Sequence, residues 1–353
     1  MAPGTSVRRR VVGTVPSGPG TVAGAVESFT LDNGRGLAVT VWTWGATLVE
    51  VLTPDRHGRV GNVVLRLPDL DAYRDRTRNP YVGATVGRYC RCVAQGRLLL
   101  DGVVHTLDRN DGAHHVHGGG EGFDRRIWSA ESAEDDRGIE VRLTLDSADG
   151  DQGYPGAVRA QCGYRVDTAN RLTIWYTAVT TAPTVVGLTN HAFWNLAGSG
   201  TVDGHRLALN SVRVVPFDAE LIPLAGPPHE VAGSELDFGR PRRLGAQRLD
   251  TFYALDAPAW AARLHDPRSG RTMSLVTDQS GMGVYSADHS PWPRAGLCLE
   301  TGPWPDAPNR PDFPSARLDP GEVYRARTTH TFSTDTAERL LGTGEHGHGI
   351  ASP

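Results

Sequence analysis

The sequence predicts an all-β protein, a large antiparallel β-sandwich, and three observations support this prediction. Most segments with a recognisable secondary-structure pattern are short, rich in β-branched residues and bounded by turn residues. Helical periodicity with caps is scarce, so we expect one short helix, within residues 67–75. The 42 glycines and 24 prolines separate these segments without any repeat period. Strands this short can bury one face only if sheets stack on each other.

The expected strands follow one another along the chain without a convincing linker. Each one alternates or runs apolar and ends at turn residues, as at Asn33-Gly34 and Pro54-Asp55. The clearest segments are 26–33, 36–54, 137–147, 171–181, 272–278 and 323–333. We therefore expect a single domain over residues 26–335. The stretches on either side, 1–25 and 336–353, are predicted to be a flexible lead-in and a disordered tail.

Composition limits the possible partners and compartment. A hydrophobic share of 39% and a charged share of 22% are typical of a soluble globular protein, and no apolar run is long enough to span a membrane. A net charge of −4 argues against nucleic-acid binding. Residues 6–29 lack the apolar core of a signal peptide, and four scattered cysteines fit a reducing compartment. We expect a cytoplasmic monomer or homodimer with a small-molecule substrate and neither nucleic-acid nor membrane partners.

The chain contains no lysine, so every permanently charged cation is an arginine. Schiff-base chemistry on a lysine, including a lysine-bound pyridoxal phosphate, is therefore excluded.

The first polar cluster is the histidine-rich stretch 110–128. On an extended chain His115 and His117 share one face and His114 points away from it. Together with Glu121, the two histidines resemble half of a cupin metal motif, but the required spacing of a later histidine is missing. A structural histidine pair is the alternative interpretation. We predict no metal site and no cofactor.

The second and third clusters lie around a histidine and a glutamate. Asn190 and His191 are followed by Phe193 and Trp194, which combines hydrogen-bonding groups with the flat apolar faces that suit a sugar. Glu300 ends an apolar run and is followed by a stretch rich in proline. A carboxylate held by rigid backbone is a candidate proton-transfer group.

These clusters fall within motifs that resemble the aldose 1-epimerases, or galactose mutarotases, from about Val26 to Phe332. The motifs, in chain order, are "WGATLVEVLTPDRHGRVGNVVLR", "NPYVGATVGR", "HHVHGGGEGFDRRIW", "GDQGYPG", "TNHAFWNLAG" and "LETGPWPDAPNRPDFP". The resemblance implies the β-supersandwich of that family and cofactor-independent interconversion of hexopyranose anomers.

The resemblance also implies roles for individual residues. Glu300 would be the base that takes the proton of the O1 hydroxyl, and His191 the acid that protonates the ring oxygen. His117 would be a second donor near that oxygen, and Asp250 would bind sugar hydroxyls. Asn190 and Trp194 are further candidates for substrate binding.

The sequence departs from the family pattern at three positions. Arg91 and Cys92 replace an Asn-Arg pair that binds the sugar, and Gly283 replaces a glutamine. On a strand, a shift of one residue turns a side chain to the opposite face, so Arg91 would substitute poorly unless a bulge realigned it. Arg91 is kept as a candidate for substrate binding.

Several functions stay open at this point. The first is a mutarotase with a changed sugar preference. The second uses the same acid–base pair for cyclisation or isomerisation of a modified sugar or of a compound that is not a sugar. A carbohydrate-binding module without catalysis and a metal enzyme of cupin type are weaker alternatives.

Overall fold

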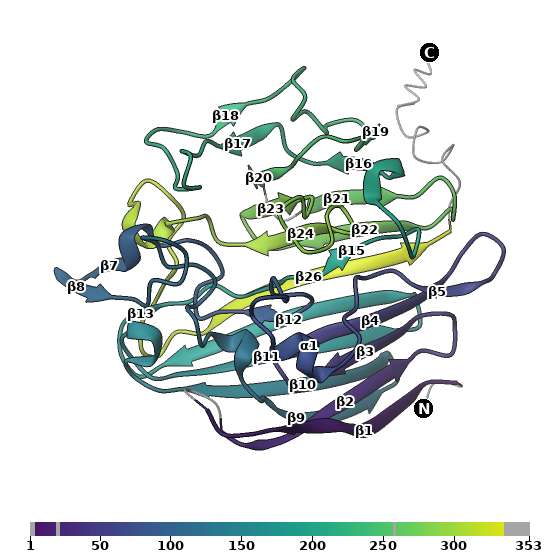
Figure 1. The fold of residues 1–353 in the computed structure, drawn as a ribbon, viewed down its shortest axis with the longest axis horizontal. Coiled ribbons are helices and arrows are strands. Elements are labelled where there is room, and N and C mark those ends of the chain that lie inside the picture. The colour runs from purple at the N-terminus through teal and green to yellow at the C-terminus, as the bar shows by residue number, and fades with distance from the viewer. Residues whose placement is uncertain (1–3, 19–21, 257–258, 335–353) are drawn as a thin grey trace, which may run out of the picture.

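Antiparallel strands make up most of the computed structural model, which describes residues 4–18, 22–256 and 259–334 (Figure 1). The first sheet has five strands that follow the chain order and hydrogen-bond as β1-β2-β3-β4-β5. Their bounds are β1 Ser6–Val15, β2 Gly24–Asp32, β3 Ala38–Trp42, β4 Thr47–Pro54 and β5 Val60–Asn62.

The second sheet has nine strands in the order β19-β16-β21-β22-β26-β12-β11-β10-β9. Its strands are β9 Ser129–Asp135, β10 Gly138–Ser147, β11 Val158–Asp167, β12 Arg171–Thr180, β16 Arg206–Leu209, β19 Arg242–Arg243, β21 Ala259–His265, β22 Thr272–Thr277 and β26 Tyr324–Ser333. Along β12, Leu172, Ile174, Tyr176 and Ala178 are buried, so one face of this strand meets the core.

The third sheet has six strands in the order β15-β24-β23-β20-β17-β18. They are β15 Phe193–Trp194, β17 Arg213–Val215, β18 His229–Glu230, β20 Asp250–Ala254, β23 Gly281–Tyr285 and β24 Leu297–Gly302. This sheet supplies much of the candidate site described below.

Short elements complete the fold. Three two-stranded pairs are β6 Thr85–Val86 with β14 Thr189–Asn190, β7 Arg97–Leu100 with β8 Val103–Thr106, and β13 Thr184–Val185 with β25 Arg317–Leu318. The single-turn 3-10 helices are Ala94–Gly96, Phe123–Arg125, Asp151–Gly153, Val202–Gly204 and Ala307–Asn309. The predicted short helix is confirmed as α1, Leu70–Arg74, and Asp69 caps it by accepting a hydrogen bond from the Ala72 amide at 2.9 Å.

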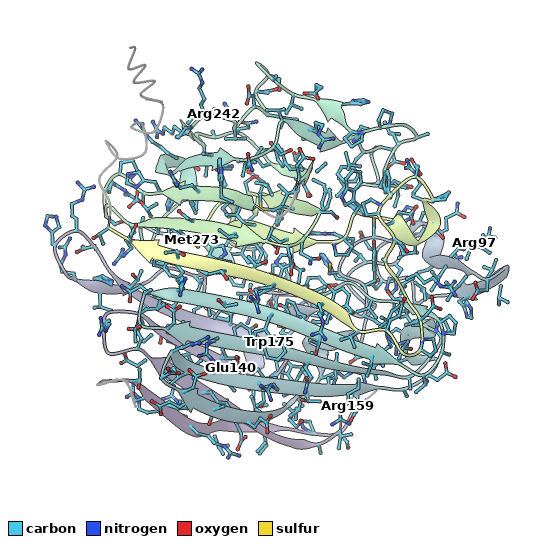
Figure 2. The ribbon with its side chains drawn as sticks, turned by 180° about the vertical axis from the view of Figure 1, so that it is seen from behind. Arg97, Glu140, Arg159, Trp175, Arg242 and Met273 are labelled. Atoms are coloured by element: carbon cyan, nitrogen blue, oxygen red, sulfur yellow. The ribbon has the colours of Figure 1, made fainter. Side chains whose placement is uncertain are left out.

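One large apolar core joins the sheets. Figure 1 shows the five-stranded sheet lying across β9–β12, and the core contains residues from both sheets, including Phe29, Val39, Val141 and Ile174. The outer face of the nine-stranded sheet is polar, and there the Trp175 indole donates to Glu140 at 3.1 Å (Figure 2). The prediction of stacked antiparallel sheets is confirmed.

The strands expected from the sequence also match the observed strands in position, except that one expected segment is divided into two strands. The segment predicted over 36–54 forms two strands, β3 and β4, because the chain turns between them. Gly45 has a φ of +62° in this turn, and a Cβ there would lie 2.5 Å from the carbonyl oxygen of Asp124.

The lead-in predicted over residues 1–25 differs from the structure. Residues 6–15 form β1, which pairs with β2 and adds an edge strand to the first sheet. The proline and glycine residues at 16–20 misled the prediction, because they follow this strand and do not interrupt it. The tail predicted over 336–353 lies outside the described residues. No helix within the described ranges has the length and apolar character needed to cross a bilayer.

Candidate active site

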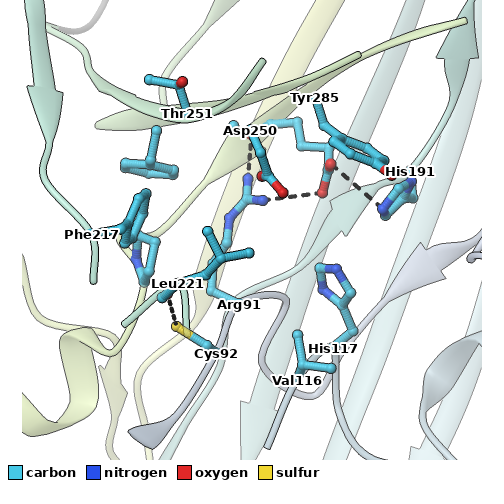
Figure 3. A pocket seen from close by; sticks show the side chains of 14 residues that line it. Arg91, Cys92, Val116, His117, His191, Phe217, Leu221, Asp250, Thr251 and Tyr285 are labelled. Atoms are coloured by element: carbon cyan, nitrogen blue, oxygen red, sulfur yellow. Dashed lines mark hydrogen bonds and ion pairs between the residues drawn. The ribbon is translucent and has the colours of Figure 1, made fainter. Parts of the chain in front are cut away.

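A cavity of about 190 Å³ lies beside the six-stranded sheet (Figure 3). Strands β20, β23 and β24 supply part of its lining, and the remainder comes from the loops around Arg91, His117, His191 and Leu221. The predicted base and acid, Glu300 and His191, therefore share one cavity.

Glu300 is placed by β24, a strand on which all six residues are buried. Side chains alternate along a strand, so Cys298 and Glu300 face the same side. Each of them contacts His191: Cys298 Sγ lies 3.6 Å from Nδ1, and Glu300 Oε1 lies 3.5 Å from Nε2. The exposed fraction of Glu300 is only 3%, so the carboxylate is held inside the protein.

His191 follows β14 and is fixed on two sides by aromatic rings. The Phe193 ring centroid is 5.0 Å away and that of Tyr81 is 5.8 Å away. Burial raises the pKa of Cys298 well above its ordinary value, so its sulfur remains a neutral thiol. A thiol sulfur can accept a hydrogen bond from Nδ1–H of His191. That arrangement leaves Nε2, the nitrogen near Glu300, free to face a molecule bound in the cavity.

His117 reaches the same cavity but is oriented differently. Its Nδ1 lies 2.8 Å from the carbonyl oxygen of Cys90, so Nδ1 carries the proton and donates it. Burial first, and then the charges of His191 and Arg91, lower the pKa of His117 well below its ordinary value. The imidazole is therefore neutral and its Nε2 is an acceptor. This geometry favours acceptance from a substrate hydroxyl over the donor role expected from the sequence.

Arg91 points into the cavity and contacts the predicted base. Its Nη1 donates to Glu300 Oε2 at 3.1 Å, and its Nη2 donates to the Glu300 carbonyl oxygen. Burial alone would lower the pKa of Arg91, but the Glu300 carboxylate raises it above the ordinary value, so the guanidinium stays charged. We expected a one-residue shift along a strand to turn Arg91 away from the sugar. That argument does not apply, because Arg91 lies in an irregular segment between the isolated bridges of Tyr89 and Val93.

Gly283 faces the same guanidinium. It pairs with Glu300 across β23 and β24, and a Cβ at this position would lie 2.8 Å from Arg91 Nη1 and 3.2 Å from Nη2. The two departures from the family pattern, Arg91 and Gly283, are therefore in contact. The guanidinium occupies space that a side chain at position 283 would need.

Asp250, at the start of β20, also lines the cavity. Its side chain is open to solvent at the cavity mouth, but the surrounding protein and then the Glu300 charge raise the pKa of Asp250 to about 6, against the opposing effect of Arg91. Its carboxyl group is thus placed to accept hydrogen bonds from a bound polar molecule at neutral pH.

Two predicted binding residues do not line this cavity. Asn190 donates to the Gly83 carbonyl at 2.7 Å and to the Tyr164 hydroxyl at 3.0 Å, so its amide holds the fold together. Trp194 is buried and packs on His330, with ring centroids 5.0 Å apart. The structure contradicts a direct role of Asn190 and Trp194 in substrate binding, because successive side chains around His191 point in different directions.

The other residues of the histidine-rich cluster are structural. His115 is fully buried between the Asp108 carbonyl and the Tyr154 hydroxyl, each 2.6 Å from a ring nitrogen. Glu121 pairs with Arg125 at 3.3 Å. His115 and His117 do not share a face, because His117 has a φ of +54° and the chain there is not extended. The half-cupin metal interpretation is therefore wrong for this cluster.

Another set of ligand atoms does converge, on the cavity itself. One nitrogen of His117, one of His191 and one oxygen of Glu300 all lie within 4.8 Å of one another. Such a set can hold a transition metal. Here Arg91 already supplies a positive charge to Glu300, which opposes the binding of a cation.

Sequence reasoning missed three residues that shape the cavity. Tyr285 lines it, Tyr81 contacts both histidine rings, and Cys298 contacts His191. Tyr81 stands within the quoted motif "NPYVGATVGR", and Cys298 lies two residues before Glu300. Strand periodicity was the signal that could have placed Cys298 beside Glu300.

Comparison with known proteins agrees with this geometry. The family model described as aldose 1-epimerase matches residues 27–331. The chain belongs to the aldose 1-epimerase family. It is 35% identical over 352 residues to galactose mutarotase of Sus scrofa, covering 93% of this chain and 99% of that protein. It is 32% identical over 334 residues to aldose 1-epimerase of Escherichia coli K12, covering 86% and 94%.

Solved structures of aldose 1-epimerase relatives have the same fold. Galactose 1-epimerase from Lactobacillus acidophilus gives a TM-score of 0.81 at 26% identity, covering 93% of this chain and 99% of that chain. An aldose epimerase homologue from C. elegans gives a TM-score of 0.80 at 27% identity, covering 86% and 98%. The β-supersandwich that the family resemblance implied is therefore confirmed.

Proposed function

We propose that the protein is an aldose 1-epimerase, a cofactor-independent isomerase that interconverts the anomers of a pyranose. The observation that supports this function best is the separation of 3.5 Å between His191 Nε2 and Glu300 Oε1 within one cavity. A hemiacetal carries its O1 hydroxyl and its ring oxygen on the same carbon. An acid and a base that serve these two oxygens must therefore lie close together, as these two groups do.

Ring opening requires two proton transfers. Glu300 takes the O1 proton while the bond between C1 and the ring oxygen breaks, and His191 Nε2–H gives its proton to that oxygen. The product is an open-chain aldehyde, with one proton gained by Glu300 and one lost by His191. Rotation about the C1–C2 bond exposes the other face of the carbonyl, and both protons return as the ring closes.

The neighbouring residues hold these two groups ready for the reaction. Arg91 fixes the Glu300 carboxylate through Nη1 and its backbone through Nη2. Cys298 accepts from His191 Nδ1, so that only Nε2 exchanges its proton. His117 Nε2 and Asp250 accept from sugar hydroxyls. The substrate partner is accordingly a reducing sugar.

The alternative of a cyclase or a different isomerase has no specific support. The relatives and solved structures reported above are named as mutarotases and epimerases. A carbohydrate-binding module would not need the buried acid and base that this cavity contains.

The test is the rate of mutarotation of freshly dissolved α-aldoses, followed by polarimetry. The panel should contain D-glucose, D-galactose and deoxy derivatives of D-glucose. We expect acceleration above the spontaneous rate for at least one sugar, and at least a thousandfold lower kcat for Glu300→Gln, in the range seen when an essential catalytic group is lost.

A variant outside the cavity controls for this substitution. Glu50→Gln changes a carboxylate that pairs with Arg66 at 2.7 Å and does not line the cavity, so it should leave kcat unchanged. If no sugar on the panel reacted, or if Glu300→Gln retained full activity, the proposed reaction or its base would be wrong.

A further inference from the structure

One wall of the cavity offers few hydrogen-bond partners to a substrate hydroxyl group. Figure 3 shows Phe217, Leu221 and Cys92 on the side away from His191 and His117, with Arg91 between the two sides. Phe252 and Pro305 also line the cavity. The side chains that exchange protons are thus confined to one end of the site.

The exposed polar groups nearest this wall already have partners, and Arg91 Nε, which has none among the described residues, is itself buried from the cavity. Both terminal nitrogens of Arg91 donate to Glu300, and the arginine also lies over the Phe252 ring at 5.2 Å. The Cys92 thiol lies 3.5 Å from the Leu221 carbonyl oxygen and donates to it. Gly283 contributes no side chain. A hydroxyl placed against this wall would lose water without gaining an equivalent hydrogen bond.

The wall is held in place by its own backbone contacts. Leu221 has a φ of +60°, which is uncommon for a bulky residue without a constraint. The Asp218 carboxylate accepts from the amides of Glu220 and Ile222 at 2.9 and 3.0 Å, and so fixes the turn around Leu221. Glu220 also contacts His114 Nε2 at 3.0 Å. Strain of this kind persists only where the surroundings impose it, and it often accompanies a ligand site.

The chemistry fixes which edge of the sugar meets the wall. With O1 at Glu300 and the ring oxygen at His191, the atoms opposite C1 and the ring oxygen in a six-membered ring are C4 and C3. These two carbons are therefore directed away from the proton-transfer groups and toward Cys92, Phe217 and Leu221.

We infer that the preferred substrate is a deoxyaldose that lacks the hydroxyl at C3 or C4. This inference rests on the proposed function and names the substrate class of the same site. An apolar pocket rejects an added hydroxyl by roughly tenfold to a hundredfold. The fully hydroxylated hexose should therefore react more slowly than its deoxy counterpart by about that factor.

The experiment compares kcat/KM for mutarotation of D-glucose, 2-deoxy-, 3-deoxy- and 4-deoxy-D-glucose by the unaltered protein. We expect 3-deoxy- or 4-deoxy-D-glucose to exceed D-glucose by at least tenfold after subtraction of each spontaneous rate. The 2-deoxy sugar is the matched control, because its missing hydroxyl lies next to C1, and it should show no such gain. Equal or faster reaction of D-glucose would overturn the inference but leave the epimerase activity standing. Failure of every sugar would refute both.

A pair of variants tests the wall itself. Leu221→Asn places an amide on the wall, and asparagine tolerates a positive φ better than leucine does. We expect the preference for the deoxy sugar to fall at least threefold in this variant. Leu224→Asn is the control, because Leu224 is exposed in the same loop and does not line the cavity, so the preference should be unchanged. An unchanged preference in Leu221→Asn would contradict the assignment of the wall.

Discussion

The Arg91 guanidinium lies where a side chain at position 283 would have to begin, since a Cβ on Gly283 would fall 2.8 Å from Nη1. Any residue other than glycine would force the guanidinium to shift relative to Glu300. The two positions are therefore coupled through the base of the proposed reaction.

Replacement of this glycine tests that coupling. Gly283→Ala should lower the free energy of unfolding by roughly 1 to 3 kcal/mol through overpacking, and it should lower kcat because the guanidinium moves away from Glu300. Urea denaturation and mutarotation rates measure the two effects. Gly204→Ala is the matched control, because a Cβ at Gly204 meets no atom of the described residues within 4 Å. An equal cost at both glycines would rule out the proposed contact with Arg91.

Cys298 should act as a positioning residue for His191. Cys298→Ala removes the acceptor 3.6 Å from Nδ1, so we expect kcat to fall several-fold and the pH profile of kcat to change. Cys298→Ser restores an acceptor and should recover much of the loss. Cys162→Ala removes another buried thiol, one outside the cavity, and should leave kcat unaltered. If serine rescued nothing, the hydrogen bond would not be the cause.

The ionisation of Asp250 should be visible in sugar binding. With a pKa of about 6, its carboxylate is an acceptor at pH 7 and is mostly protonated at pH 5. We expect KM for the sugar to rise as the pH falls through 6. In Asp250→Asn, KM at pH 7 should be higher and this pH dependence should disappear. Persistence of the full dependence in the variant would assign it to another group.

The raised pKa of Asp250 also predicts how the stability of the protein depends on pH. The pKa of Asp250 in the folded protein lies above its ordinary value of 3.8, so ionisation is less favourable in the folded state than in the unfolded chain. The protein therefore loses stability from this group as the pH rises from about 4 to about 6. Asp250→Asn should remove that loss, which thermal unfolding at pH 4 and pH 7 would show. A larger stability difference in the variant would refute the direction of the shift.

Activity should not depend on a metal ion. Although His117, His191 and Glu300 converge, the Arg91 charge at 3.1 Å from Glu300 Oε2 opposes a cation there. Prolonged dialysis against EDTA is expected to leave the mutarotation rate unchanged. Loss of activity that a divalent ion restores would show that the three ligands hold a metal.

Local patterns in the sequence predicted the sheets and the helix well, because strand periodicity and turn residues are properties of short segments. Residues 171–180 show this clearly, since their alternating apolar residues face the core. The strand β1 was missed because its alternation is weak and its residues remain largely exposed at the edge of a sheet.

The site was predictable only in part. Glu300 and His191 could be named from their motifs, and the structure brings them together. The inward direction of Arg91, the contact of His117 Nδ1 with a backbone carbonyl and the structural contacts of Asn190 could not be foreseen. Each depends on a backbone path or a partner distant in the sequence, such as the Cys90 carbonyl that contacts His117 Nδ1. Residue spacing on an assumed straight strand contains no such information.

The Arg91–Glu300 pair joins positions 209 residues apart in the chain. Contacts between such distant positions form slowly, because a long loop must close first. After dilution from denaturant, circular dichroism should therefore recover before mutarotation does. Recovery of mutarotation would then report on the formation of this long-range contact, which makes enzymatic activity a direct measure of tertiary assembly.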